Sequence, residues 1–261
     1  MFNDKKKIRP ITLFTQTNVG KERDNNEDSV ASLVLNANSS KKEFDCGILV
    51  VADGMGGHEM GEVASDIAVK TFVEKVLHNI LHSSKDKSKI DFSEILEKSV
   101  IAANKEVINM AGGKSNRMGT TLVGAIIFDN RAYIANVGDS RAYLVKSKKS
   151  LIQITKDHSA VQAMLDANII TKEQAKNHPR KHIITKSLGL NEEIRPDIFE
   201  QNLDDGVLLL CSDGLFNMVD DEDIIQAVNG NIYNTAEDLI TLANKHGGLD
   251  NISVGLASYN S

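Results

Sequence analysis

The sequence predicts an α+β protein built on mainly antiparallel β-sheets, and three observations support this fold class. Short runs of β-branched and aliphatic residues recur along the chain, separated by turn residues. Two longer segments carry apolar residues at helical spacing. Consecutive short strands joined by tight turns pair antiparallel, because a parallel pair needs a long crossover connection. With 261 residues, 41% of them hydrophobic, we expect one domain spanning residues 1–261.

The first strands are expected at residues 11–18, 29–35 and 47–52, and the third is an uninterrupted apolar run. It leads directly into Asp53. A carboxylate is costly to bury without a positive partner, so an acid at the tip of a buried strand indicates a cation site. The glycine that follows removes a side chain beside this acid, which allows the Gly54 carbonyl to approach an ion closely.

Two long helices are expected next. The first begins after Gly61, and its apolar face consists of Ala64, Ile67, Ala68, Phe72, Val76 and Ile80. The second begins at a capping-box pattern from Asp91 to Glu94 and ends before Gly112. Its apolar face consists of Leu96, Val100, Ala103, Val107 and Met110.

The rest of the chain returns mostly to strands. Strands are expected at residues 121–128, 132–137, 142–145, 151–154, 183–188, 196–200, 207–211 and 252–257. Short helices are expected at 161–165, 220–228 and 235–245. Residues 157–181 mix a helical pattern, a capping box from Thr171 to Gln174 and a loop around Pro179. We expect this segment to be a mobile surface flap that faces the substrate.

Charge and cysteine content narrow the class of protein. A net charge of −6 without a basic face argues against nucleic acid as the main partner. No apolar run reaches the length of a membrane span and the N-terminus lacks a signal-peptide core, so a cytoplasmic protein is expected. Cys46 and Cys211 lie in apolar runs and are expected to be free buried thiols. A cysteine-dependent phosphatase would need an arginine six positions after either, where Ala52 and Asn217 stand.

Acidic residues recur at the ends of the expected strands. They are Glu27, Asp28, Asp53, Asp139, Asp213 and Asp250. In antiparallel sheets one strand ends beside the start of the next, so these acids can converge on one rim. Clustered carboxylates raise one another's pKa unless cations neutralise them, and oxygen ligands favour Mg²⁺ or Mn²⁺. No Cys-x-x-Cys or His-Glu-x-x-His motif points to zinc.

Each of these residues also has a purely structural interpretation. A single Asp-Gly pair is typical of a turn. His58 is a loop residue or a hydrogen-bond donor to a neighbouring group, with a catalytic acid as the functional alternative, and His158 is better explained by a local structural hydrogen bond than by chemistry. Arg23 alone would be a surface ion pair.

Seven motifs follow one another along the chain, namely Arg23-x-x-x-Glu27-Asp28, Val51-Ala-Asp53-Gly-Met-Gly-Gly-His58, Met118-Gly-Thr-Thr121, Asn136-Val-Gly-Asp139-Ser-Arg141, Ile154-Thr-Lys-Asp157-His158-Ser159, Ser212-Asp213-Gly214-Leu215 and Asp250-Asn251-Ile-Ser-Val254. This ordered set resembles the metal-dependent protein serine/threonine phosphatases of type 2C, above all their bacterial branch. The resemblance covers nearly the whole chain. It implies an α-β-β-α sandwich of two antiparallel sheets flanked by helix pairs, with metals at one edge.

The resemblance also implies roles for individual residues. Asp53 would bridge two Mn²⁺ or Mg²⁺ ions, with the Gly54 carbonyl on one ion and Asp213 and Asp250 on the other. Asp139 would join Asp213 at a third ion. Glu27 and Asp28 would hold water molecules bound to the metals. Arg23 would bind the phosphate group of the substrate, and His178 in the flap would contact the substrate.

The implied reaction is hydrolysis of phosphoserine and phosphothreonine by a water activated between two cations. This chain has Met55 where animal members carry a histidine. The proton for the leaving group is therefore assigned to water on the metals, with His58 as the alternative. The implied setting is a monomer in a bacterial cytoplasm that acts on phosphorylated proteins and opposes a eukaryotic-type serine/threonine kinase.

Two other functions stay open on the sequence. One is a catalytically inactive scaffold of the same fold that binds phosphoproteins, although Asp53, Asp213, Asp250 and Arg23 are all present. The other is a two-metal phosphodiesterase or nuclease, which the acids alone would permit.

Overall fold

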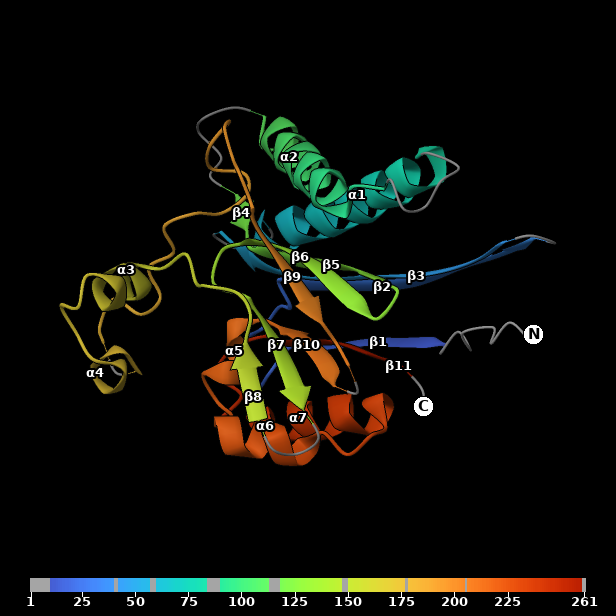
Figure 1. The fold of residues 1–261 in the computed structure, drawn as a ribbon. Coiled ribbons are helices and arrows are strands. Elements are labelled where there is room, and N and C mark those ends of the chain that lie inside the picture. Colours follow the sequence, from blue (N-terminus) through green and yellow to red (C-terminus); the bar gives the residue numbers. More distant parts are fainter. Residues whose placement is uncertain are drawn as a thin grey trace.

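The computed structural model describes residues 10–39, 42–56, 60–83, 90–112, 118–146, 150–176, 178–204 and 206–259. Two antiparallel sheets lie face to face, with helices on both outer faces (Figure 1). The α+β class and the sandwich are therefore confirmed.

The first sheet has the strand order β2-β3-β5-β6-β9, and the short strand β4 pairs with β3. Its strands are β2 (Asp28–Ser39), β3 (Lys42–Met55), β4 (Gly119–Thr120), β5 (Leu122–Phe128), β6 (Arg131–Val137) and β9 (Asp197–Asn202). The second sheet has the order β1-β11-β10-β7-β8. Its strands are β1 (Ile11–Asn18), β7 (Arg141–Lys146), β8 (Ser150–Gln153), β10 (Val207–Cys211) and β11 (Ile252–Tyr259).

Helices cover each sheet on its outer side. α1 (Met60–His82) and α2 (Phe92–Met110) pack on the first sheet, and α6 (Asp221–Ala227) and α7 (Ile232–Lys245) pack on the second. α3 (Ala160–Asp166) and α4 (Lys172–Lys176) extend away from the sandwich on the left of Figure 1. The four-residue helix α5 (Asp213–Phe216) follows β10 directly.

Strand β3 is apolar throughout its centre because both of its faces are buried. Ile48 and Val50 pack with the helices α1 and α2, whereas Leu49 and Val51 pack between the two sheets. Side chains of a strand point alternately to its two faces, so a central strand needs apolar residues at every position. The uninterrupted run from Gly47 to Ala52 follows from this.

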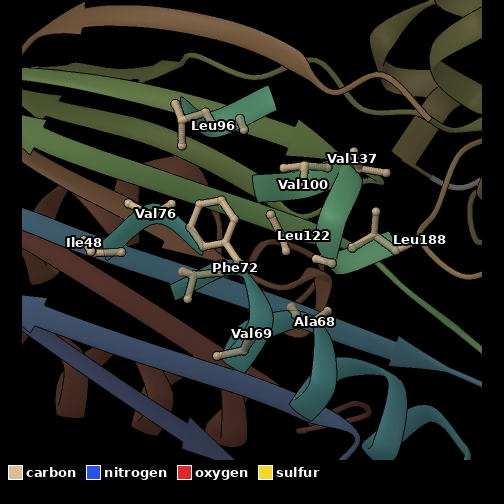
Figure 2. Packing of buried hydrophobic residues seen from close by; sticks show 14 of the residues in the cluster. Ile48, Ala68, Val69, Phe72, Val76, Leu96, Val100, Leu122, Val137 and Leu188 are labelled. Atoms are coloured by element: carbon tan, nitrogen blue, oxygen red, sulfur yellow. The ribbon is translucent and has the colours of Figure 1, made fainter. Parts of the chain in front are cut away.

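The expected helix faces are largely confirmed. Phe72 of α1 is fully buried near the centre of the cluster in Figure 2, where its ring lies against Gly124 of β5. A Cβ atom at Gly124 would come within 2.5 Å of the Phe72 ring, so the glycine provides the space for this ring. The cap of α2 is also present, since the Glu94 N–H donates to Asp91 Oδ1 at 3.0 Å. Met110 is 61% exposed, so the apolar face of α2 stops at Val107.

Three expectations need correction. Residues 183–188 are not a strand: Ile184 makes an isolated bridge with Ser159 and Leu188 makes another with Thr120 of β4, and these two single bridges do not form a continuous ladder. Asp53 is not the tip of its strand, since β3 continues to Met55 by pairing with β4. β6 and β7 do not pair with each other despite the short connection, which instead crosses from the first sheet to the second.

Gly138 makes this crossing possible. It has φ +109, and a Cβ atom there would lie 2.6 Å from the Thr121 side chain. A residue with a side chain would therefore be strained and would clash. The connection carries Asp139 into the space where the two sheets meet.

Candidate active site

The six acids that the sequence places near strand ends lie around one edge of the sandwich. Asp28 at the start of β2 is the pairing partner of Asp53 on β3. Asp139 lies on the connection between the sheets, Asp213 is the first residue of α5, and Asp250 precedes β11. Asp28 and Asp139 are buried, whereas Asp53, Asp213, Asp250 and Glu27 are partly exposed.

The charges of these acids act on one another. Burial and the neighbouring Asp213 raise the pKa of Asp139 to about 7. Burial, Asp213 and Asp250 raise the pKa of Asp28 to about 7, and burial and Asp250 raise the pKa of Asp213 to about 6. The pKa of Asp53 is raised well above its usual range by burial and by four other acids, namely Asp28, Asp213, Asp139 and Asp250. The structure therefore brings together the acids that the sequence singles out.

Asp28 has one satisfied and one unsatisfied oxygen. The Ser212 hydroxyl donates to Asp28 Oδ2 at 2.7 Å. Asp28 Oδ1 is buried and has no hydrogen-bond partner in the described part of the chain. A buried carboxylate oxygen without a donor is costly, so a cation or its water would stabilise it.

Asn251 connects the loop before β2 to the start of β11. Its side-chain amide donates to the carbonyls of Val19 at 2.9 Å and Asn25 at 3.0 Å, and its Oδ1 accepts the Glu27 N–H at 2.8 Å. These bonds place the Arg23 and Glu27 segment beside Asp250. Asn251 and Ser212 lie within two of the sequence motifs, but no sequence pattern indicated these contacts.

Arg23 and Asp250 form an ion pair at the exposed side of the site. Arg23 Nη2 lies 2.8 Å from Asp250 Oδ2, and 53% of the Arg23 side chain is exposed. The hydrogen bond to Asp250 raises the pKa of Arg23. It uses one of the five guanidinium N–H donors, which leaves others for a bound anion.

The backbone around Asp53 is held from two sides. The Thr121 hydroxyl accepts the Asp53 N–H at 2.9 Å, and the Thr121 N–H donates to the Asp53 carbonyl at 2.8 Å. A Cβ atom at Gly54 would lie 2.2 Å from the Gly61 carbonyl oxygen, at the start of α1. Gly54 therefore permits close packing of α1 on β3, a reason that the sequence did not reveal.

The donor set at this edge fits divalent cations. Its acids supply oxygen ligands and raise one another's pKa, and Asp28 Oδ1 has no donor among the residues that the structure describes. Among the described residues, however, no three His, Cys, Asp or Glu side chains are placed so that they alone could hold one ion. Asp250 is bound to Arg23 and also accepts the Asn251 N–H at 2.9 Å. Holding an ion there would require Asp250 to move or further oxygen ligands to take part.

The histidines have different outcomes. His58 lies outside the described residues, so its catalytic assignment stays a prediction. His158 makes the expected structural bond, since its Nδ1 accepts the Gly138 N–H at 3.0 Å. His178 accepts the Arg180 N–H at 3.1 Å, and its substrate-binding role stays a prediction. A fourth histidine, His182, is near enough to Asp213 for its charge to lower the pKa of Asp213, and no sequence pattern indicated this.

Both cysteines are buried and free, as expected. Burial raises the pKa of each thiol to about 12, so neither is a nucleophile at neutral pH. In the part of the chain that the structure describes, no helix is both long and apolar enough to cross a membrane.

Comparison with known proteins assigns the family. Residues 21–244 match the family model described as Protein phosphatase 2C. Serine/threonine phosphatase stp of Listeria welshimeri is 38% identical over 253 residues, which cover 94% of both chains. Protein phosphatase PhpP of Streptococcus pneumoniae is 38% identical over 252 residues, 94% of this chain and 96% of the relative.

Solved structures agree in fold. Serine/threonine phosphatase Stp1 from Staphylococcus aureus has a TM-score of 0.84 at 30% identity and is covered completely, as is this chain. The catalytic domain of the serine/threonine protein phosphatase PstP, solved in complex with 2 manganese ions, has a TM-score of 0.75 at 32% identity, covering 96% of this chain and 99% of that chain. The chain therefore belongs to the protein phosphatase 2C family, which is a family of metal-dependent serine/threonine phosphatases.

Proposed function

We propose that this chain hydrolyses phosphoserine and phosphothreonine in proteins at the edge where Asp28, Asp53, Asp139, Asp213 and Asp250 meet. The convergence of these acids beside an exposed arginine carries the proposal, because it joins a cation-binding oxygen cluster to a phosphate-binding group. The family assignment supports the same activity.

Asp53, Asp213, Asp250 and the Gly54 carbonyl would hold two ions, and Asp139 with Asp213 would hold a further one. Bound cations would lower the pKa of a water for attack on phosphorus and stabilise charge on the phosphoryl oxygens. Glu27 and Asp28 would hydrogen-bond to water around the ions. Mn²⁺ is the ion to test first, because the PstP structure holds manganese.

Arg23 would bind the phosphate group of the substrate. Its guanidinium group matches the geometry of phosphoryl oxygens, and its exposed position allows a protein-borne phosphate to reach it. The ion pair with Asp250 keeps the arginine beside the predicted ions while the site holds no substrate. The same ion pair would also be present if Arg23 had a purely structural role. Kinetic measurements are therefore needed to distinguish phosphate binding from a structural ion pair.

The wider setting is also proposed. The whole chain, residues 1–261, acts as one phosphatase domain, and residues 157–181 form a flap that selects substrates. The enzyme works as a monomer in a bacterial cytoplasm and opposes a eukaryotic-type serine/threonine kinase. Its relatives are bacterial proteins named as protein or serine/threonine phosphatases, which supports the bacterial setting and the substrate class.

Phosphate release from a phosphothreonine peptide tests the proposal. We expect turnover with millimolar Mn²⁺, none with EDTA, and a loss of at least about a thousandfold in Asp53→Asn, because the substitution removes a ligand charge. Asp238→Asn, on the exposed face of α7, is the matched control and should keep full activity.

Each outcome has a distinct meaning. Full activity in Asp53→Asn would refute the metal assignment. A folded protein that binds Mn²⁺ but releases no phosphate would favour the phosphoprotein-binding scaffold. Cleavage of a phosphodiester with no activity on phosphopeptides would favour the nuclease class.

A further inference from the structure

The Arg141 side chain joins three segments around the acid cluster. Arg141 lies two residues after Asp139, at the start of β7, and 25% of its side chain is exposed. Its Nε lies 2.9 Å from Asp157 Oδ1, and its Nη2 lies 2.7 Å from Asp157 Oδ2. Its Nη1 donates to the Tyr143 hydroxyl at 2.9 Å. All three guanidinium nitrogens are therefore engaged at the edge of the group.

The flat face of the same group contacts the helix that carries Asp213. Arg141 Cζ lies 3.7 Å from the centroid of the Phe216 ring. Phe216 is the last residue of α5 and Asp213 is the first. A planar cation bound along its edge and stacked on its face has a single orientation. Arg141 thus holds α5 in a fixed place relative to β7.

Asp157 completes the connection to Asp139. The next residue, His158, donates its N–H to the Gly138 carbonyl at 2.9 Å and accepts the Gly138 N–H at Nδ1 at 3.0 Å. The short connection from Gly138 to Arg141 is therefore bound at both ends to residues 157–158. Asp157 is itself well ordered by its surroundings, with 9% of its side chain exposed and a further bond from Gln153 at 3.1 Å.

We infer that Arg141 is a positioning residue that fixes the connection carrying Asp139 relative to α5, which carries Asp213, and thereby supports the binding of a divalent cation by these two acids. The inference rests on the proposed function, since it concerns an ion of the same site. Lysine could not replace arginine here, because an ammonium group cannot bind Asp157 through two nitrogens and stack on Phe216 at once. Groups that orient metal ligands typically change metal affinity by about 10- to 100-fold when they are removed.

Calorimetric titration of the metal-stripped protein with Mn²⁺ tests the inference without relying on turnover. Asp139→Asn identifies the binding event that depends on Asp139. We expect Arg141→Lys and Asp157→Asn to weaken that same event about tenfold or more, while the other events stay within about twofold. Both variants disrupt the same ion pair between Arg141 and Asp157. The double variant should therefore have an affinity for Mn²⁺ no lower than that of whichever single variant binds Mn²⁺ less tightly.

Arg131→Lys is the matched control. Arg131 is 56% exposed and pairs with Glu200 on the outer strand β9 of the first sheet, so this variant should bind like the wild type. Phe216→Leu keeps the ion pair and removes only the stacking, and it replaces Arg141→Lys in the comparison if the latter does not fold. Unchanged isotherms in the folded Arg141, Asp157 and Phe216 variants would overturn the inference. The inference would also be overturned if these variants weakened every Mn²⁺ binding event equally, or if Asp139→Asn lost none of the Mn²⁺ binding events.

Phosphopeptide hydrolysis, measured separately, distinguishes the two proposals. If the wild type is active and Arg141→Lys binds Mn²⁺ normally, the inference fails and the proposed function stands. If the wild type is inactive while the isotherms change as expected, the proposed function fails and the inference stands.

Discussion

Arg23 is the residue where the structural and functional interpretations differ most clearly. It bonds to Asp250 at 2.8 Å, yet about half of its side chain is exposed to solvent. We expect Arg23→Ala to raise KM for a phosphopeptide roughly 10- to 100-fold, because a charge-assisted contact to phosphate is lost. The measurement is steady-state kinetics at saturating Mn²⁺, with kcat and KM determined separately.

Two further variants sharpen this test. Arg23→Lys keeps the charge but loses the planar fork, so it should fall between the wild type and Arg23→Ala. The exposed Arg195 serves as control, and Arg195→Ala should leave KM unchanged. An unaltered KM in Arg23→Ala would leave only the ion pair with Asp250 as its role.

At the level of single residues, the sequence predicts the acids but not the groups that hold them in place. Asp53, Asp213 and Asp250 stand out in the sequence because each adjoins a turn residue near the end or the start of an expected strand. Asn251 acts on the Val19 carbonyl, 232 positions away, and Ser212 acts on Asp28, 184 positions away. Such contacts exist only after folding, so no local pattern reports them.

At the level of elements, the segment that carries α3 and α4 leaves and rejoins the sandwich at one place. The Ala160 N–H donates to the Ile183 carbonyl and the Thr185 N–H donates to the His158 carbonyl, each at 2.8 Å. Between these closed ends the segment presents exposed side chains, such as Ile169, which is 70% exposed. Residues 161–181 can therefore be exchanged without altering the sheets, and His182 is kept because its charge acts on Asp213.

We expect this exchange to change which phosphopeptides are preferred. Replacing residues 161–181 with the matching segment of a relative should shift the ratio of kcat/KM values for two phosphopeptides by about tenfold, because recognition contacts beyond the phosphate are altered. Turnover of a small phosphate ester, which lacks the peptide residues that the segment would contact, should change less than about threefold. An unaltered ranking of peptides would show that the segment does not select substrates.

The elements themselves were predictable where one periodicity dominates. Strand β3 and helix α1 have consistent apolar patterns: α1 begins within two residues of its expected start, whereas β3 extends from residue 42 to residue 55 around its expected range of 47–52. Residues 183–188 have a short apolar pattern but make only single bridges at Ile184 and Leu188, so the local pattern predicts a strand that continuous pairing does not support. The crossing between the sheets at Gly138 also depends on tertiary contacts, here with Thr121.

At the level of the whole molecule, the sandwich concentrates negative charge at one edge. In the metal-free protein the pKa values of Asp28 and Asp139 are about 7 and that of Asp213 is about 6, compared with about 3.9 in an unfolded chain. The native state therefore binds more protons than the unfolded chain between about pH 4 and pH 7. Protonation of these acids therefore adds to the free energy of unfolding. This contribution is fully present below about pH 4 and is lost as the pH rises through about 6 to 7.

This argument predicts an unusual effect of Asp139→Asn. The amide imitates the protonated acid and cannot ionise, so the metal-free variant should match the wild type near pH 4.5. At pH 7.5 it should melt roughly 5–10 °C higher, since it avoids both the burial of an ionised carboxylate and its repulsion from Asp213. Thermal unfolding in EDTA at the two pH values measures this difference.

Mn²⁺ neutralises the same repulsion between the acids. The ion should therefore raise the melting temperature of the wild type more at pH 7.5 than at pH 4.5. At pH 7.5 it should also raise the melting temperature of the wild type more than that of Asp139→Asn. A variant less stable than the wild type at pH 7.5 would mean that Asp139 contributes a structural hydrogen bond that outweighs the repulsion. The edge would then be stable without cations, contrary to the charge distribution that defines it.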